Sequence, residues 1–123
     1  MTAWASAELD KIGAADELQL ASLRVDGALR KPVTIWVVRH DDNLYVRSVR
    51  GRTSKWFRGV TDRHQGHIRA GGVDKDVTFV EVVDVNDEVD EAYRTKYGHY
   101  PAQYVDPMVG AAARASTLEL IPR

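Results

Sequence analysis

The segment 31–39, KPVTIWVVR, is apolar on both of its faces, and this feature constrains the fold more than any other. Successive side chains of a β-strand point to opposite sides. Here one side carries two valines and an isoleucine, and the other carries a threonine, Trp36 and a valine. A strand of this kind must be covered on both sides. A small β-barrel covers only its inner face, so we expect a helix or a second copy of the chain to cover Trp36.

Alternating apolar residues between turn signals predict further strands, most of them joined as hairpins. The expected strands are residues 17–25, 31–39, 44–48, 66–70, 77–85 and 116–121. A helix is expected at 86–97, because its apolar residues fall on one stripe and Gly98 can end it. Shorter helices are expected at 6–13 and 107–115. The predicted fold is a small α+β barrel of about six mostly antiparallel strands, with one well-formed helix before the last strand.

The length of 123 residues predicts a single domain, residues 1–123. No apolar run approaches the ~18 residues of a membrane-spanning helix. The N-terminal sequence has no basic region followed by an apolar one, so no secretion signal is expected. The absence of cysteine excludes disulfides and thiolate-bound metals. These features predict a cytoplasmic protein.

Charge is unevenly spread along the chain, although the net charge is only −1. Residues 47–69 contain seven Lys or Arg against one acid, and residues 74–91 contain eight acids against one lysine. Two complementary solvated surfaces would explain this, and so would an anion site in the first region. The net charge and the acidic region argue against a nucleic-acid-binding protein.

The segment 43–60, NLYVRSVRGRTSKWFRGV, is the candidate site. It reads as a strand that breaks at Gly51 and continues into a helical turn capped by Thr53 or Ser54. Such a strand, turn and helix start gathers free backbone amides at the positive end of a helix dipole, which suits a phosphate. The same segment carries five basic residues: Arg47, Arg50, Arg52, Lys55 and Arg58.

Several segments resemble a bacterial family of unassigned function, domain of unknown function 2255. They are LRKPVTIWVVR, LYVRSVRG, KWFRG, IRAGGVDKDVTF, AYRTKYG and TLELIPR, and they span nearly the whole chain. The central segments YVRSVRG and SKWFR are also similar to the flavin-binding split-barrel superfamily of pyridoxamine phosphate oxidases and deazaflavin-dependent reductases. That resemblance implies a split β-barrel.

The split-barrel resemblance also implies a cofactor, FMN or the deazaflavin coenzyme. A homodimer that shares the site is expected because one small barrel provides only half a cleft and Trp36 needs a cover. Carried over by position, the cofactor-binding residues are Arg47, Ser48, Arg50 and Gly51 at the phosphate, with Ser54, Lys55 and Trp56 bordering it. The implied activity is that of an oxidoreductase. The chain has no Ser-Arg-Lys triplet, which does not favour pyridoxamine oxidation. No residue stands out as a general acid or nucleophile, so catalytic residues remain unassigned.

Two other functions are compatible with the sequence. A barrel that has lost its cofactor would serve as a small-ligand or interaction module. Tyr45, Trp56 and Phe57 among basic residues could stack the bases of a single-stranded nucleic acid. Trp36 is interpreted as a packing or dimer residue.

His64 and His67 lie three residues apart, but they have no third ligand in the sequence and basic neighbours that repel a cation. No metal site is therefore expected.

Overall fold

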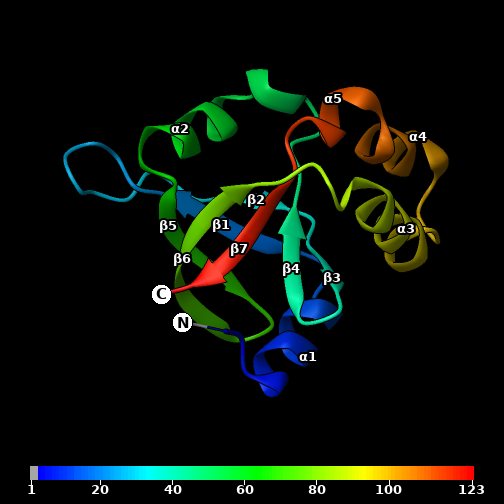
Figure 1. Cartoon of the computed structure of the whole chain (residues 1–123), viewed down its shortest axis with the longest axis horizontal. Helices are drawn as coiled ribbons and strands as arrows, with labels where there is room; N and C mark the ends of the chain where they lie inside the picture. Colours follow the sequence, from blue (N-terminus) through cyan, green and yellow to red (C-terminus); the bar gives the residue numbers. More distant parts are fainter. Residues whose placement is uncertain (1–2) are drawn as a thin grey trace.

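The computed structural model describes residues 3–123, whose strands form one antiparallel sheet curled into a half-barrel (Figure 1). The strands are β1 (Leu18–Ser22), β2 (Val33–Ile35), β3 (Val38–His40), β4 (Asn43–Val46), β5 (Gln65–Ala70), β6 (Val73–Glu81) and β7 (Leu118–Pro122). The helices are α1 (Ser6–Ala14), α2 (Lys55–Arg63), α3 (Asn86–Tyr97), α4 (Ala102–Val105) and α5 (Ala111–Arg114). Short 3₁₀ turns lie at Gly51–Thr53 and Asp106–Val109. The predicted α+β barrel is confirmed. The predicted domain, 1–123, includes residues 1 and 2, which lie outside the described residues.

The two edge strands of the sheet are consecutive in the sequence. The strand order is β2-β1-β5-β6-β7-β4-β3, and only Trp36 and Val37 connect β2 to β3. The chain therefore passes from one edge of the sheet to the other in two residues, which curls the sheet upon itself. The single strand predicted at 31–39 was wrong, because it is divided at this seam, and the sheet has seven strands instead of about six.

Helix α3 covers the seam between β2 and β3. The Tyr97 hydroxyl accepts a hydrogen bond from the Val37 amide at 3.2 Å and lies 2.7 Å from the Asp16 carbonyl. The Lys96 amine donates to the carbonyls of Ala15 at 2.6 Å and Val37 at 2.7 Å. Burial lowers the pKa of Lys96 to about 8. These bonds satisfy the Val37 backbone groups at the seam and two carbonyls of the connection from α1 to β1.

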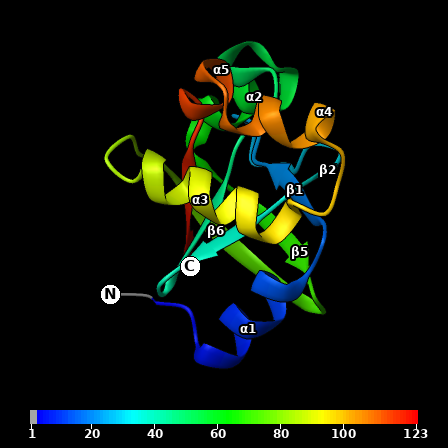
Figure 2. The same cartoon turned by 90° about the vertical axis from the view of Figure 1, so that its right-hand side faces the viewer.

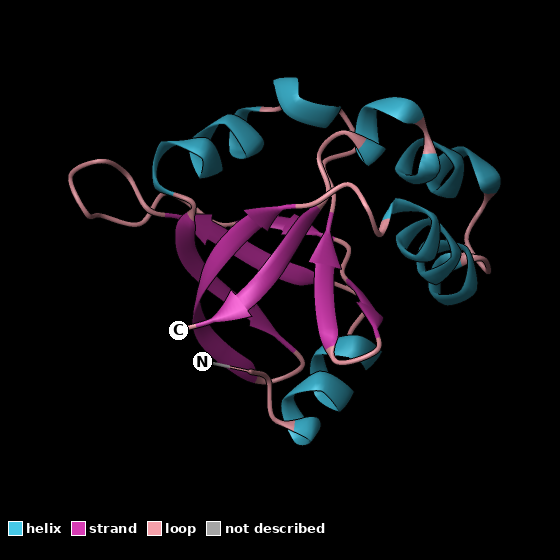
Figure 3. Cartoon of the chain, in the orientation of Figure 1, coloured by secondary structure: helices cyan, strands magenta, loops and turns pink. Residues whose placement is uncertain are grey.

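Trp36 packs against the same helix. Its indole is stacked on the Tyr97 ring with centroids 4.0 Å apart and planes 2° from parallel. The cover expected for Trp36 is therefore a helix of the same chain. Figure 3 shows the helices arranged around the outside and the ends of the sheet.

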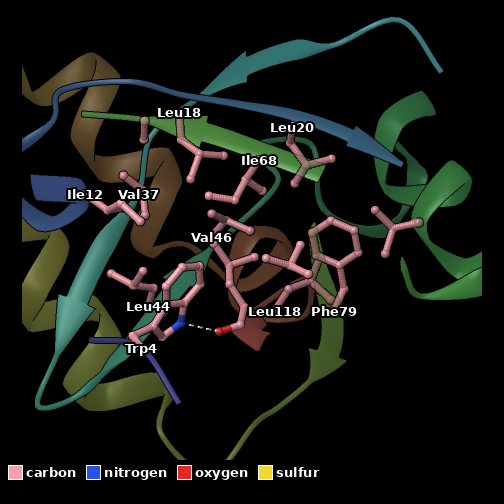
Figure 4. Close-up of a cluster of buried hydrophobic side chains, with 14 of the residues drawn as sticks. Trp4, Ile12, Leu18, Leu20, Val37, Leu44, Val46, Ile68, Phe79 and Leu118 are labelled. Atoms are coloured by element: carbon pink, nitrogen blue, oxygen red, sulfur yellow. Dashed lines mark hydrogen bonds between the residues drawn. The ribbon is translucent and has the colours of Figure 1, made fainter. Parts of the chain in front are cut away.

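Two hydrophobic clusters flank the strands. The larger one fills the inside of the curled sheet, where Leu44 and Val46 are fully buried (Figure 4). The Trp4 indole closes it by donating to the Leu120 carbonyl at 2.9 Å. The smaller cluster lies between β3, β4 and α3, and it includes Tyr45 and Tyr93. Burial of each large apolar side chain contributes roughly 1.5–3 kcal/mol, so the alternation along β4 stabilises both layers.

The helix predicted at 86–97 is confirmed. Its first residue is Asn86, and Val85 is its N-cap. The helix predicted at 107–115 was too simple. Its residues form the second 3₁₀ turn and α5. Within residues 3–123, no helix is both long enough and apolar enough to cross a membrane.

Candidate functional site

The corner between β4 and α2 is built by two serines. Ser54 caps α2, as predicted, and its Oγ accepts a hydrogen bond from the Phe57 amide at 3.3 Å. The Oγ atoms of Ser48 and Ser54 lie 2.7 Å apart. The first amides of a helix have no acceptor within it. With the Phe57 amide bound by the cap, the amides of Lys55 and Trp56 are left for water or a ligand.

Gly51 fixes the turn between these serines. Its φ is +71°, and a Cβ at this position would lie 2.7 Å from the Ala112 carbonyl oxygen of α5. Its amide donates to the Ser48 carbonyl at 2.9 Å. Gly51 was predicted at the phosphate, but its amide is used within the turn and the residue is buried. Its observed role is to let the turn approach α5.

A cleft of about 510 Å³ opens beside this corner, and we call it the cationic cleft. It is lined by Val33, Ser48, Val49, Arg50, Thr53, Ser54, Lys55, Trp56 and Arg58. Three of these residues are basic and none is acidic. Arg50, Lys55 and Arg58 are exposed and form no ion pair with any residue of the described chain. The cationic cleft is therefore a region of uncompensated positive charge.

A second cleft, of about 460 Å³, is also lined by Trp56, and we call it the adjoining cleft. It shares Val33, Lys55 and Trp56 with the cationic cleft, and its other lining residues are Leu20, Ser22, Arg24, Leu29, Arg30, Lys31 and Pro32. Its lining surface is mostly apolar. Arg30 is held by Asp62 at 2.5 Å and by the Gly59 carbonyl at 3.1 Å. Together the two clefts combine the positive charge of the cationic cleft, the shared Trp56 indole and the apolar lining of the adjoining cleft.

Arg47, which was predicted at the phosphate, does not line either cleft. It follows Tyr45 on the outer face of β4, beneath α3, and its side chain is fully buried. Its guanidinium donates to Asp90 at 2.5 Å, to Thr117 Oγ1 at 2.8 Å and to the Met108 carbonyl at 3.0 Å. It also donates to the Asn86 carbonyl and side-chain oxygens, both at 3.1 Å. All of its nitrogens are thus bound inside the protein.

Arg52 also points away from the cationic cleft. It binds Glu81 at 2.6 Å, and its guanidinium lies 5.1 Å from the centre of the Phe57 ring. Hydrogen bonds from Arg52 and then His64 hold the pKa of Glu81 below its usual value. Of the five basic residues in the segment 47–58, the structure therefore brings three to the cleft.

The histidines occupy separate places. His64 lies 3.1 Å from Glu81. His67 has ring nitrogens 3.0 Å from Asp74 and 2.9 Å from Asp76, and these two carboxylates raise its pKa. Among residues 3–123, no group of three or more His, Cys, Asp or Glu side chains is arranged to hold a metal ion.

The sequence matches a bacterial protein family over residues 8–120. The family is described as uncharacterized protein conserved in bacteria (DUF2255). The chain belongs to this family. No curated protein matches its sequence.

Solved structures with the same fold have low sequence identity to this DUF2255 chain. A FAD-binding protein from Mesorhizobium loti is 16% identical with a TM-score of 0.63, over 98% of this chain and 91% of that one. An F420 reductase is 13% identical with a TM-score of 0.58, over 94% and 90%. A heme storage protein from Vibrio cholerae is 13% identical with a TM-score of 0.64, over 96% and 89%. These similarities show the split-barrel fold.

Some lining residues were not in the predicted set. Arg58 could have been included from the sequence, because residues three and four apart share a helix face and it follows Lys55 by three positions. Val33 and Leu20 could not, since β1 and β2 reach the clefts only through the curl of the sheet.

Proposed function

We propose that this DUF2255 protein binds FMN or the deazaflavin coenzyme and acts as an oxidoreductase. The cofactor phosphate occupies the cationic cleft, where Ser48, Arg50, Ser54, Lys55 and Arg58 surround it. The redox chemistry is that of the cofactor, and the protein holds the phosphate and orients the ring.

The observation that carries the proposal is the charge of the cationic cleft. Arg50, Lys55 and Arg58 line one space of about 510 Å³ without an acidic residue. A phosphate there would gain charge-assisted hydrogen bonds, which are about twice as strong as neutral ones. It would also lie at the first turn of α2, where the helix dipole favours an anion.

Trp56 and the adjoining cleft suit the cofactor ring. Flavin-type rings are flat and aromatic, so an aromatic or apolar wall suits their faces. Trp56 lines both clefts, and Leu20, Leu29 and Pro32 extend the apolar surface beyond it. The FAD-binding protein and the F420 reductase of the same fold support a cofactor of this class.

A homodimer would close the open side of the site. Val49 lines the cationic cleft and Leu29 the adjoining cleft, and they are 52% and 50% exposed. Apolar side chains at the mouth of a charged cleft suit a covering surface. We therefore propose that two copies associate, and light scattering at increasing protein concentration will measure their mass with and without FMN.

Binding of FMN and riboflavin to the same protein tests the phosphate site. The two ligands share the ring and differ in the phosphate. We expect FMN to bind at least about tenfold tighter than riboflavin, a difference of about 1.4 kcal/mol. The double variant K55Q/R58Q should lose most of this preference. The matched control R94Q removes an exposed charge on α3 and should retain it.

The absorption spectrum of the isolated protein and a parallel titration with the deazaflavin coenzyme identify the cofactor. A colourless protein that binds neither coenzyme would overturn the proposal and leave a ligand or interaction module. Tighter binding of hemin than of either coenzyme would also overturn it. No histidine of the described chain lines either cleft, so we expect hemin to bind weakly.

A further inference from the structure

A third cleft, of about 470 Å³, shares no residue with the two clefts beside Trp56. It is lined by Asp16, Glu17, Trp36, Tyr100 and Tyr104, and we call it the aromatic cleft. Its residues come from the chain entering β1, from the connection between β2 and β3, and from the segment after α3 that includes α4, and Figure 2 shows the ribbons of β1, α3 and α4. Tyr97, the last residue of α3, joins that helix to the chain entering β1 through its hydroxyl, 2.7 Å from the Asp16 carbonyl.

The tyrosine rings around this cleft do not enclose the Trp36 indole between them. Tyr97 is stacked on the indole at 4.0 Å, and the Tyr100 ring lies 5.4 Å from it. The centroids of Tyr97 and Tyr100 are themselves only 6.2 Å apart. The two tyrosines are too close together to lie on opposite faces of the indole. Trp36 is only partly buried and lines the cleft, so its indole can contact a ligand there, and Tyr104 adds a ring that is 56% exposed.

The charge of the aromatic cleft is opposite to that of the cationic cleft. Asp16 and Glu17 are exposed, and neither forms an ion pair with a described residue. The Tyr100 hydroxyl lies 3.5 Å from Asp16 Oδ2. The neighbouring base, Lys96, directs its amine to the carbonyls of Ala15 and Val37. Two carboxylates are therefore available beside electron-rich ring faces.

We propose that the aromatic cleft binds an organic ammonium ion with alkyl substituents. Such a cation is attracted to the faces of Trp and Tyr rings and is weakly hydrated, so little hydration is lost when it enters. Asp16 and Glu17 supply the opposite charge, and Trp36, Tyr100 and Tyr104 supply the apolar and ring contacts. The site is independent of the proposed cofactor site and selects the opposite charge.

Choline and dimethylbutanol, its analogue with an uncharged carbon in place of the nitrogen, separate this proposal from simple apolar binding. Titration of isotope-labelled protein, followed by NMR, should show saturable shifts at the Asp16 and Glu17 amides and at the Trp36 indole. We expect the uncharged analogue to bind at least about tenfold more weakly, because it lacks the cation–π and ionic attraction.

Two variants and one control locate the site. Tyr104→Ala removes an exposed ring, and E17Q removes one charge, so each should weaken choline binding several-fold while the fold is retained. D84N, which removes an exposed acid elsewhere, should leave the affinity unchanged. Equal binding of choline and the uncharged analogue, shifts outside the cleft, or no saturable shift would each overturn the proposal. FMN affinity of Tyr104→Ala should equal that of the unmodified protein, which keeps this test separate from the cofactor proposal.

Discussion

Arg47 and Arg50 lie three residues apart and have different environments. Arg47 is buried under α3 and donates five hydrogen bonds, whereas Arg50 is exposed at the cationic cleft. The alternation along β4 predicts that Arg47 and Ser48 face opposite sides. It does not predict that Asp90 of α3 lies on the outer side of β4, where it binds Arg47. Asp90 belongs to an acidic run that the helix dipole alone would explain, so this part of the candidate site could not be predicted from the sequence.

Replacing Arg47 should destabilise the protein far more than replacing Arg50. Arg47→Met leaves the buried Asp90 carboxylate with Arg114 as its remaining cationic partner and leaves the other acceptors of the Arg47 guanidinium unpaired. Loss of one member of a buried ion pair costs about 3–5 kcal/mol, and we expect the lower end because Arg114 remains. Arg50→Met should change the free energy of unfolding by less than about 0.5 kcal/mol. Urea unfolding measures both. A stable Arg47→Met protein that lost its preference for FMN over riboflavin would show that Arg47 contributes to phosphate binding.

The 3₁₀ turn at Gly51–Thr53 packs against α5, and the sequence predicts only part of this contact. The glycine at position 51 predicts a turn, and Ser54 predicts the start of a helix. The close approach of Ala112 to Gly51 depends on residues about sixty positions away, and no local pattern encodes it.

A pair of glycine variants isolates the cost of this contact. Gly51 and Gly72 both have positive φ, +71° and +83°, but nothing lies within 4 Å of a Cβ at Gly72. Both substitutions to alanine carry the conformational strain, of order 1–2 kcal/mol. Only Gly51→Ala adds a clash with backbone. We expect Gly51→Ala to lower the thermal unfolding midpoint more than Gly72→Ala, and equal midpoints would contradict the contact.

The molecule as a whole is closed by the seam between β2 and β3. The α+β class and most strands are predictable from alternation and turn residues. The division of the strand at 31–39 is not, because its two-residue period continues through Trp36 and Val37. The division depends on the contacts of Lys96 and Tyr97 with Val37, about sixty residues away in the chain.

The dependence of stability on pH should show the lowered pKa of Lys96. Its pKa falls from 10.5 to about 8 on folding, so between these values the unfolded chain binds more protons than the folded one. The contribution of Lys96 to the free energy of unfolding therefore increases as the pH rises from 8, and it is smallest below 8. Burial raises the pKa of Tyr97 above its usual value of 10, which lowers stability at still higher pH.

Lys96→Met should flatten the rise in stability between pH 8 and about 9.5, the range below the titration of unfolded tyrosine. Denaturant midpoints at several pH values measure it for the variant and for R94Q, a matched control on the same helix. An unchanged pH profile in Lys96→Met would show that the amine titrates normally.

The short seam has a consequence for self-association. An open sheet offers two exposed edges, each able to recruit a strand from another molecule. In this protein both edge strands are consecutive in the sequence and joined by Trp36 and Val37. Neither edge strand can therefore separate from the curled sheet without the other. Cleavage of the backbone between these two residues would release both edges at once and turn a curled sheet into a template for aggregation.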